Sequence, residues 1–137
     1  MDPSNRKRIV LGLAGLALAA TFLTARGQEP RPHTRAEFMR LKLEYSKLVL
    51  EGLTLENYQT IIKNAQALKK LSEAAEWEVP TIPNVGEYIV FTSEFQRLTD
   101  ELVKKAREKN TDGATLAYVR LTVNCVNCHK YVRQTAK

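Results

Sequence analysis

Two cysteines and a histidine lie close together near the end of the chain, in the segment Cys125-Val126-Asn127-Cys128-His129. Two thiols separated by two residues and followed directly by an imidazole form the attachment pattern of c-type haem. On a helix these positions are i, i+3 and i+4, which share one face. The thiols can add to the two vinyl groups of one porphyrin, while His129 binds the iron as its proximal ligand. The segment therefore predicts one covalently bound haem c, held by Cys125 and Cys128.

Other chemistry for the same cysteines fits the sequence less well. A thioredoxin-like redox pair belongs in a βαβ setting, and this sequence predicts none. A zinc site needs further ligands, and His33 is the only other histidine. A disulfide across two intervening helical residues places the Cβ atoms poorly. His33 could also be a second imidazole ligand of the iron, but it precedes the first predicted helix and fits an ordinary loop histidine better.

The first 27 residues have the layout of an export signal. Arg6, Lys7 and Arg8 precede an apolar stretch over residues 9–25, which matches a positive n-region followed by an h-region. Small residues near position 27 favour cleavage, although a stretch of this length lies at the short limit for a retained membrane anchor. In both cases the rest of the chain, residues 28–137, crosses the membrane. We expect a periplasmic protein that contacts the membrane only through this segment, if the segment is retained.

The composition fits a single folded domain. The chain has 137 residues, of which 44% are hydrophobic and 26% are charged, which suits one domain of ordinary size. Its net charge is +6, and the export segment, with four basic residues and one acidic residue, accounts for half of it. No basic stripe is interleaved with aromatic residues, which argues against nucleic-acid binding.

Capping signals and helical periodicity predict two helices directly after residue 33. Thr34 and Glu37 have the spacing of a capping box for the first helix. This helix is expected to stop near Gly52, because glycine favours the left-handed conformation of a C-cap. Thr54 is expected to cap a second helix that runs to about Trp77, since its apolar residues recur at helical spacing.

Two further helices are predicted in the second half of the chain. Two prolines interrupt the helical pattern, so residues 79–87 are expected to form a loop. Ser93 begins a second capping-box sequence and a third helix, which ends near Asn110. The last helix is expected over residues 114–135. Short connections imply antiparallel neighbours, so the predicted fold is an all-α, antiparallel up-down-up-down four-helix bundle within residues 28–137.

A C-terminal Cys-x-x-Cys-His motif on the last of four helices resembles the class II cytochromes c, that is, cytochrome c-prime and its low-spin relatives. In that family an aromatic and then a basic residue commonly follow the histidine by three and four positions. Arg133 matches the basic position, whereas Val132 stands at the aromatic position and Tyr131 comes one residue earlier. The resemblance implies that Arg133 lies near the proximal imidazole and tunes its hydrogen bonding. A solvated cation at the helix end is the alternative.

The resemblance also implies that the distal side of the iron faces the early part of the first helix. Met39 lies there, and Arg35 precedes it by one turn, as an arginine near the haem propionates does in the family. A thioether ligand would give a six-coordinate, low-spin haem suited to electron transfer, whereas a core methionine would only fill space. Counting back from Gly52 instead places Ala36 at the family's distal position. The iron would then be five-coordinate, and the protein would bind a diatomic gas such as nitric oxide or carbon monoxide.

Further residues are expected around the porphyrin. Four of them share the helical face of Cys125 and are expected to line the pocket: Tyr118, Leu121, Thr122 and Val132. Lys42 falls within the apolar face of the first helix, either as a snorkelling stem or as a partner for a haem propionate.

The function expected from these residues is electron transfer to and from a redox partner protein. No distal histidine and arginine pair suggests acid–base catalysis, so we do not expect an enzyme. Relatives in the class II family often form homodimers through their first two helices. No surface stripe in the sequence requires such a dimer.

Overall fold

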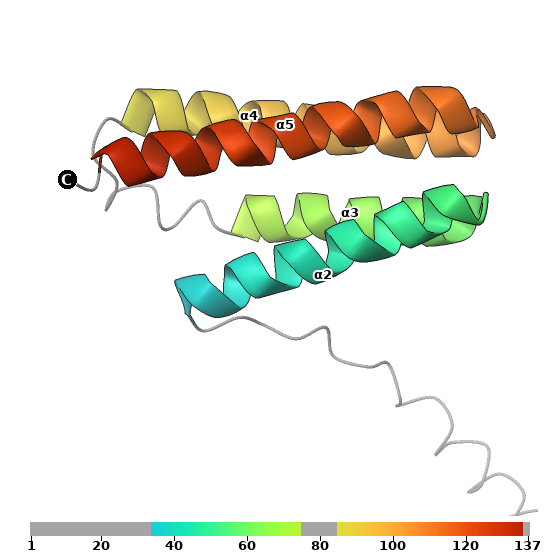
Figure 1. The fold of residues 1–137 in the computed structure, drawn as a ribbon, viewed down its shortest axis with the longest axis horizontal. Coiled ribbons are helices and arrows are strands. Elements are labelled where there is room, and N and C mark those ends of the chain that lie inside the picture. Colours follow the sequence, from blue (N-terminus) through green and yellow to red (C-terminus); the bar gives the residue numbers. More distant parts are fainter. Residues whose placement is uncertain (1–33, 75–84, 136–137) are drawn as a thin grey trace, which may run out of the picture. The chain divides into compact units, whose positions relative to one another are not determined.

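The computed structural model describes residues 34–74 and 85–135, all within one compact unit, Pro32–Lys137. The described residues form four helices and no strand: α2 (Arg35–Thr54), α3 (Tyr58–Ala74), α4 (Val85–Arg107) and α5 (Thr111–Thr135). In Figure 1 each helix runs in the direction opposite to the one before it. The predicted all-α fold with four helices packed on one another is confirmed.

Four predictions fall wholly or partly on residues that lie outside the described part of the chain. They are the export segment over residues 1–27, the loop histidine His33, Trp77 at the end of the second helix, and residues 79–84 of the predicted loop. Among the described helices, none combines the length and the apolar character that crossing a bilayer requires.

The helices pack closely along the chain, but the first and the last meet only briefly. The pairs α2 and α3, α3 and α4, and α4 and α5 are in extensive contact, whereas α2 and α5 share few contacts. The core between them is built from fully buried aliphatic side chains, the largest being Ile61, Leu68, Leu98, Leu102 and Leu121. The bundle is therefore closed tightly on three sides and loosely on the fourth.

α2 begins as predicted and ends later. The Thr34 hydroxyl accepts a hydrogen bond from the Glu37 amide at 3.2 Å, and the Glu37 carboxylate accepts one from the Thr34 amide at 3.2 Å. The helix continues past Gly52, so the predicted stop there was wrong. Gly52 serves close packing instead, because a Cβ at this position would lie 2.9 Å from Cγ1 of Ile61. The left-handed conformation falls on Glu56, whose φ is 51°.

Asparagines cap α3 and α5. Oδ1 of Asn57 accepts a hydrogen bond from the Thr60 amide at 3.1 Å, so the prediction of Thr54 as this cap was wrong. Oδ1 of Asn110 accepts one from the Gly113 amide at 2.8 Å, and α5 starts slightly earlier than expected. An asparagine before a helix satisfies amides that have no partner within the first turn.

α4 starts at Val85, well before the capping box predicted at Ser93. Residues 85–87 were expected in a loop and are helical, and Ser93 lies inside the helix. The added turns pack on the end of α5, where the Phe91 and Tyr131 rings lie 5.7 Å apart. Tertiary packing of this kind commonly outweighs a local capping signal.

Candidate functional site

A cavity of about 280 Å³ lies between α2 and α5, the two neighbours that share few contacts. α2 contributes Met39, Lys42, Leu43 and Ser46, and α5 contributes Tyr118, Leu121, Thr122, Cys125, Val126 and His129. Leu68 of α3 and Phe95 of α4 form its inner side. The cavity opens to solvent between α2 and α5, because four of its lining residues are exposed: Leu43, Thr122, Val126 and His129.

The motif residues approach this cavity from α5. Cys125 is partly buried, packs against the core and lines the cavity. His129 also lines it but has an exposed side chain at its mouth. Cys128 is partly buried and lies outside the lining. The two thiols do not form a disulfide.

Contacts with α4 set the rotation of α5 about its axis. Nδ2 of Asn124 donates a hydrogen bond to the Phe91 carbonyl at 3.0 Å, and the Tyr131 ring packs on the Phe91 ring. With Asn124 and Tyr131 turned towards α4, the adjacent face that carries Cys125 and His129 is turned towards α2. Tyr131 therefore packs on α4 and not beside the cavity.

Burial keeps both cysteines in the thiol form. It raises the pKa of Cys125 and of Cys128 above the ordinary value, and this effect outweighs the opposing influence of the Lys42 ammonium. Charged thiolates are disfavoured because a partly apolar environment solvates them poorly. At pH 7 the site therefore presents two neutral thiols.

Lys42 brings a positive charge into the cavity. Its Nζ lies 4.3 Å from the centroid of the Phe95 ring and 4.9 Å from that of Phe38, so cation–π attraction offsets part of the lost hydration. Within residues 34–74 and 85–135, no carboxylate pairs with this ammonium. Burial lowers the Lys42 pKa from 10.5 to about 8. A buried cation of this kind favours a ligand that carries negative charge.

One pair of hydrogen bonds crosses from α5 to α2 beside the cavity. The Tyr118 hydroxyl lies 3.2 Å from the carbonyl oxygen of Ser46, to which it donates, and 3.2 Å from the Ser46 hydroxyl, from which it accepts. Sequence reasoning missed Ser46. Its signal is the spacing, since Ser46 follows Met39 by two helical turns and so lies on the same face.

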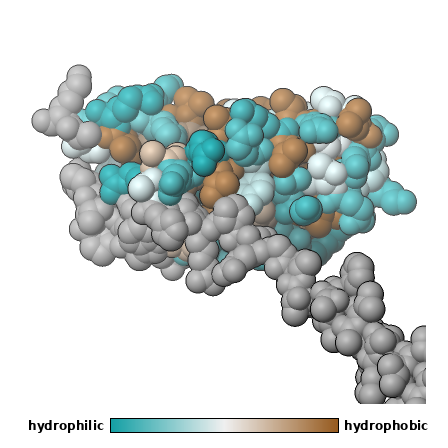
Figure 2. All heavy atoms as spheres, turned by 90° about the horizontal axis from the view of Figure 1, so that it is seen from below, coloured by the Kyte–Doolittle hydropathy of each residue, from teal (hydrophilic) through white to brown (hydrophobic). Residues whose placement is uncertain are grey.

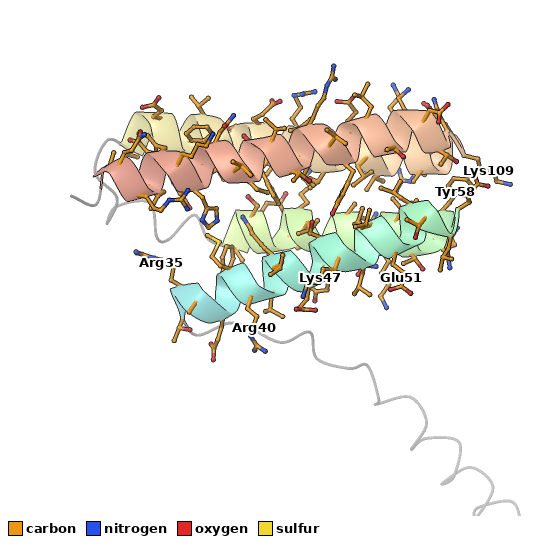
Figure 3. The ribbon with its side chains drawn as sticks, in the orientation of Figure 1. Arg35, Arg40, Lys47, Glu51, Tyr58 and Lys109 are labelled. Carbon is orange, nitrogen blue, oxygen red and sulfur yellow. The ribbon has the colours of Figure 1, made fainter. Side chains whose placement is uncertain are left out.

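The structure brings only part of the predicted site together. Seven predicted residues line the cavity: Met39, Lys42, Tyr118, Leu121, Thr122, Cys125 and His129. Four others do not: Arg35, Cys128, Val132 and Arg133. Ala36, the alternative distal residue, is exposed and is also outside the lining. Figure 3 shows Arg35 extending from the first turn of α2, at the end of the bundle where α5 ends.

A larger hollow of about 890 Å³ lies between α3 and α4. Its lining is mostly charged, and the residues in it include Lys69, Asp100, Lys104 and Arg107. Lys69 and Asp100 form an ion pair at 2.7 Å there. No motif residue reaches this hollow, so the cavity between α2 and α5 is the candidate site. In the described part of the chain, no three His, Cys, Asp or Glu side chains converge as a metal site would require.

Comparisons with protein-family models, with curated proteins and with solved structures yield no match. The described residues therefore establish a class of architecture: an all-helical protein with four helices packed against each other. Its distinguishing feature is a cavity between the first and the last of these helices, with the Cys125 thiol and the His129 imidazole at its α5 wall.

Proposed function

We propose that the protein is a c-type cytochrome that carries one haem c and transfers electrons. Cys125 and Cys128 hold the haem through thioether bonds, and His129 is the proximal iron ligand. The observation that carries the proposal is the cavity between α2 and α5, to which α5 contributes Cys125 and His129 and α2 contributes Met39.

The residues around the cavity fit a haem in three respects. The inner side is apolar, through Leu68, Phe95 and Leu121, as the porphyrin ring requires. The loose contact between α2 and α5 allows a flat group to enter between these helices while the other helix pairs keep their contacts. The Lys42 ammonium, which pairs with no carboxylate of the described helices, provides positive charge for an anionic substituent such as a propionate. The bound haem would supply an iron that cycles between Fe(II) and Fe(III).

Met39 is proposed as the distal ligand. It lines the cavity, whereas Ala36 does not, and this difference favours a six-coordinate electron carrier over a five-coordinate protein that binds a diatomic gas. A thioether opposite an imidazole raises the reduction potential of haem iron.

Residues 1–27 are proposed to direct export to the periplasm, as a cleaved signal or as an anchor. Two cysteines that form no disulfide are unusual in an exported chain. Covalent attachment to haem accounts for both of them.

The proposal is tested by producing the full chain in cells that can attach haem to such motifs. We expect a coloured protein that keeps its haem on a denaturing gel, with a mass increased by one haem and reduced by the signal if that is cleaved. Cys125→Ala together with Cys128→Ala should abolish haem that survives denaturation, while Asn127→Ala, between the two cysteines, should retain it. A colourless parent protein with two free thiols would refute the proposal.

A further inference from the structure

The outer face of α5 carries an exposed apolar stripe. Leu116, Val119, Val123 and Val126 are 53%, 51%, 53% and 47% exposed. The side of α5 that packs on the core is formed by other residues, including Ala117 and Leu121. On the face drawn in Figure 2, by contrast, hydrophobic residues are separated by hydrophilic ones. Four large apolar side chains in one helical row form a contact surface of the kind that pairs helices.

The spacing of the stripe residues is the same whether it is read from the N-terminal or from the C-terminal end of α5. Its members follow one another by three, four and three positions, which is the spacing of an a/d seam. Consider two copies of α5 packed antiparallel, with the two-fold axis at the level of Leu121 along the helix. This arrangement would place Leu116 opposite the partner's Val126. Val119 would then lie opposite the partner's Val123. The stripe is therefore complementary to itself in one antiparallel register.

The charges at the two ends of the stripe fit the same register. Asp112 precedes Leu116 by four positions, and Lys130 follows Val126 by four positions, so both continue the row. Both are exposed, and neither forms an ion pair within the described part of the chain. In the antiparallel pair Asp112 faces the partner's Lys130, and Lys130 faces the partner's Asp112. A parallel pair would place like charges opposite each other, which is unfavourable.

We infer that the protein forms a homodimer through α5, with the two helices antiparallel and related by a two-fold axis. The seam from Asp112 to Lys130 is about 27 Å long at 1.5 Å per residue. An interface of one helix per subunit is small, so the dimer is reversible and does not replace a folded monomer. Val126 belongs both to this seam and to the cavity lining, so the partner covers part of the cavity mouth. The dimer uses the last helix, not the first two that the family resemblance implied.

Sedimentation equilibrium of the full chain over a range of concentrations tests this inference. The parent protein should show a reversible monomer–dimer equilibrium. Val123→Lys places a charge in the seam and should raise the dissociation constant at least about tenfold. Val90→Lys is the matched control, because Val90 is 64% exposed but lies on α4, and it should leave the constant unchanged. All variants keep the same N-terminal segment, so their differences report on the substituted positions.

A charge reversal tests the register. Asp112→Lys alone and Lys130→Asp alone should each weaken the dimer, and the two together should restore the parent constant. A parent that remains monomeric up to about 1 mM, or a double variant that is as weak as the single ones, would overturn the inference. Binding of a monomeric parent to anionic lipid vesicles that is lost in Val123→Lys would also overturn it, and would make the stripe a membrane contact. The inference does not rest on the proposed haem, because haem-free protein should dimerise as well.

Discussion

Met39 and His129 line the same cavity, although they belong to the first and the last of the described helices. The antiparallel path of the four helices produces this relationship, since it brings the beginning of α2 and the end of α5 to the same end of the bundle (Figure 1). Both side chains carry lone pairs, so they would be able to hold the iron of the proposed haem.

If the proposed haem is bound with Met39 as a ligand, replacement of Met39 should change the absorption spectrum. Met39→Leu keeps an apolar side chain of similar volume but removes the sulfur, so we expect a shift from low-spin to high-spin absorption and new binding of carbon monoxide. Ala36→Leu is the control, because Ala36 does not line the cavity. If the Met39→Leu spectrum matches that of the parent, Met39 is not a ligand.

Lys42 should make the stability of the haem-free protein depend on pH. Burial lowers its pKa from 10.5 to about 8, so between these values the unfolded chain binds more protons than the folded one. The free energy of unfolding should then rise with pH over this window, by about 3 kcal/mol in total. Below pH 8 the full penalty of the buried charge is present.

Urea unfolding at pH 7 and pH 10 measures this effect. Lys42→Met removes the charge and keeps a long apolar stem, so this variant should be more stable than the parent at pH 7. Its free energy of unfolding should also lack the increase with pH that Lys42 causes in the parent. If the free energies of unfolding of parent and variant differ by the same amount at pH 7 and at pH 10, Lys42 does not cause the pH dependence.

Two glycines in helices should respond in opposite ways to alanine. At Gly52 a Cβ would lie 2.9 Å from Cγ1 of Ile61, which is fully buried, and 3.1 Å from its backbone nitrogen. This crowding outweighs the helix propensity gained, so Gly52→Ala should destabilise the protein by about 1–3 kcal/mol. At Gly86 a Cβ would meet nothing within 4 Å, and Gly86→Ala should be neutral or stabilising by up to about 1 kcal/mol. Thermal unfolding that ranks the two variants in the reverse order would show that α2 and α3 can separate at little cost.

The hydrogen bonds between Tyr118 and Ser46 should contribute measurably to stability. Tyr118→Phe removes both of them and should cost about 1–2 kcal/mol, because the Ser46 carbonyl and hydroxyl lose a partner. Ser46→Ala leaves the bond from Tyr118 to the main-chain carbonyl in place, so its cost should be smaller, about 0.5–1 kcal/mol. The urea midpoints of the two variants give the comparison, and equal losses would mean that the carbonyl bond contributes nothing.

Local signals in the sequence were sufficient for the four helices but not for all of their ends. The capping box at Thr34 and Glu37 depends on residues that are close in sequence, and it was predicted correctly. The start of α4 depends on contacts of Phe91 with α5, which no pattern within α4 reveals. For the same reason the sequence alone does not show why residue 52 is a glycine, since the Ile61 side chain that requires it belongs to α3.

The site shows the same division between local and tertiary information. The spacing of Cys125, Cys128 and His129 is local and identified the motif without the structure. Which of its neighbours reach the cavity depends on the rotation of α5, which Asn124 and Tyr131 fix through α4. The outer stripe was hidden because apolar residues occur on every side of this helix, so that only burial separates those of the core from those of the surface.

The two walls of the cavity belong to the first and the last of the described helices, and this has a consequence for biosynthesis. A chain is made from its N-terminus, and its segments can fold as they emerge. The cavity needs side chains of both α2 and α5, so it does not exist until α5 has been translated and has packed on the other helices. A group can bind between these walls only after α5 has been made, so products that stop before α5 cannot hold it.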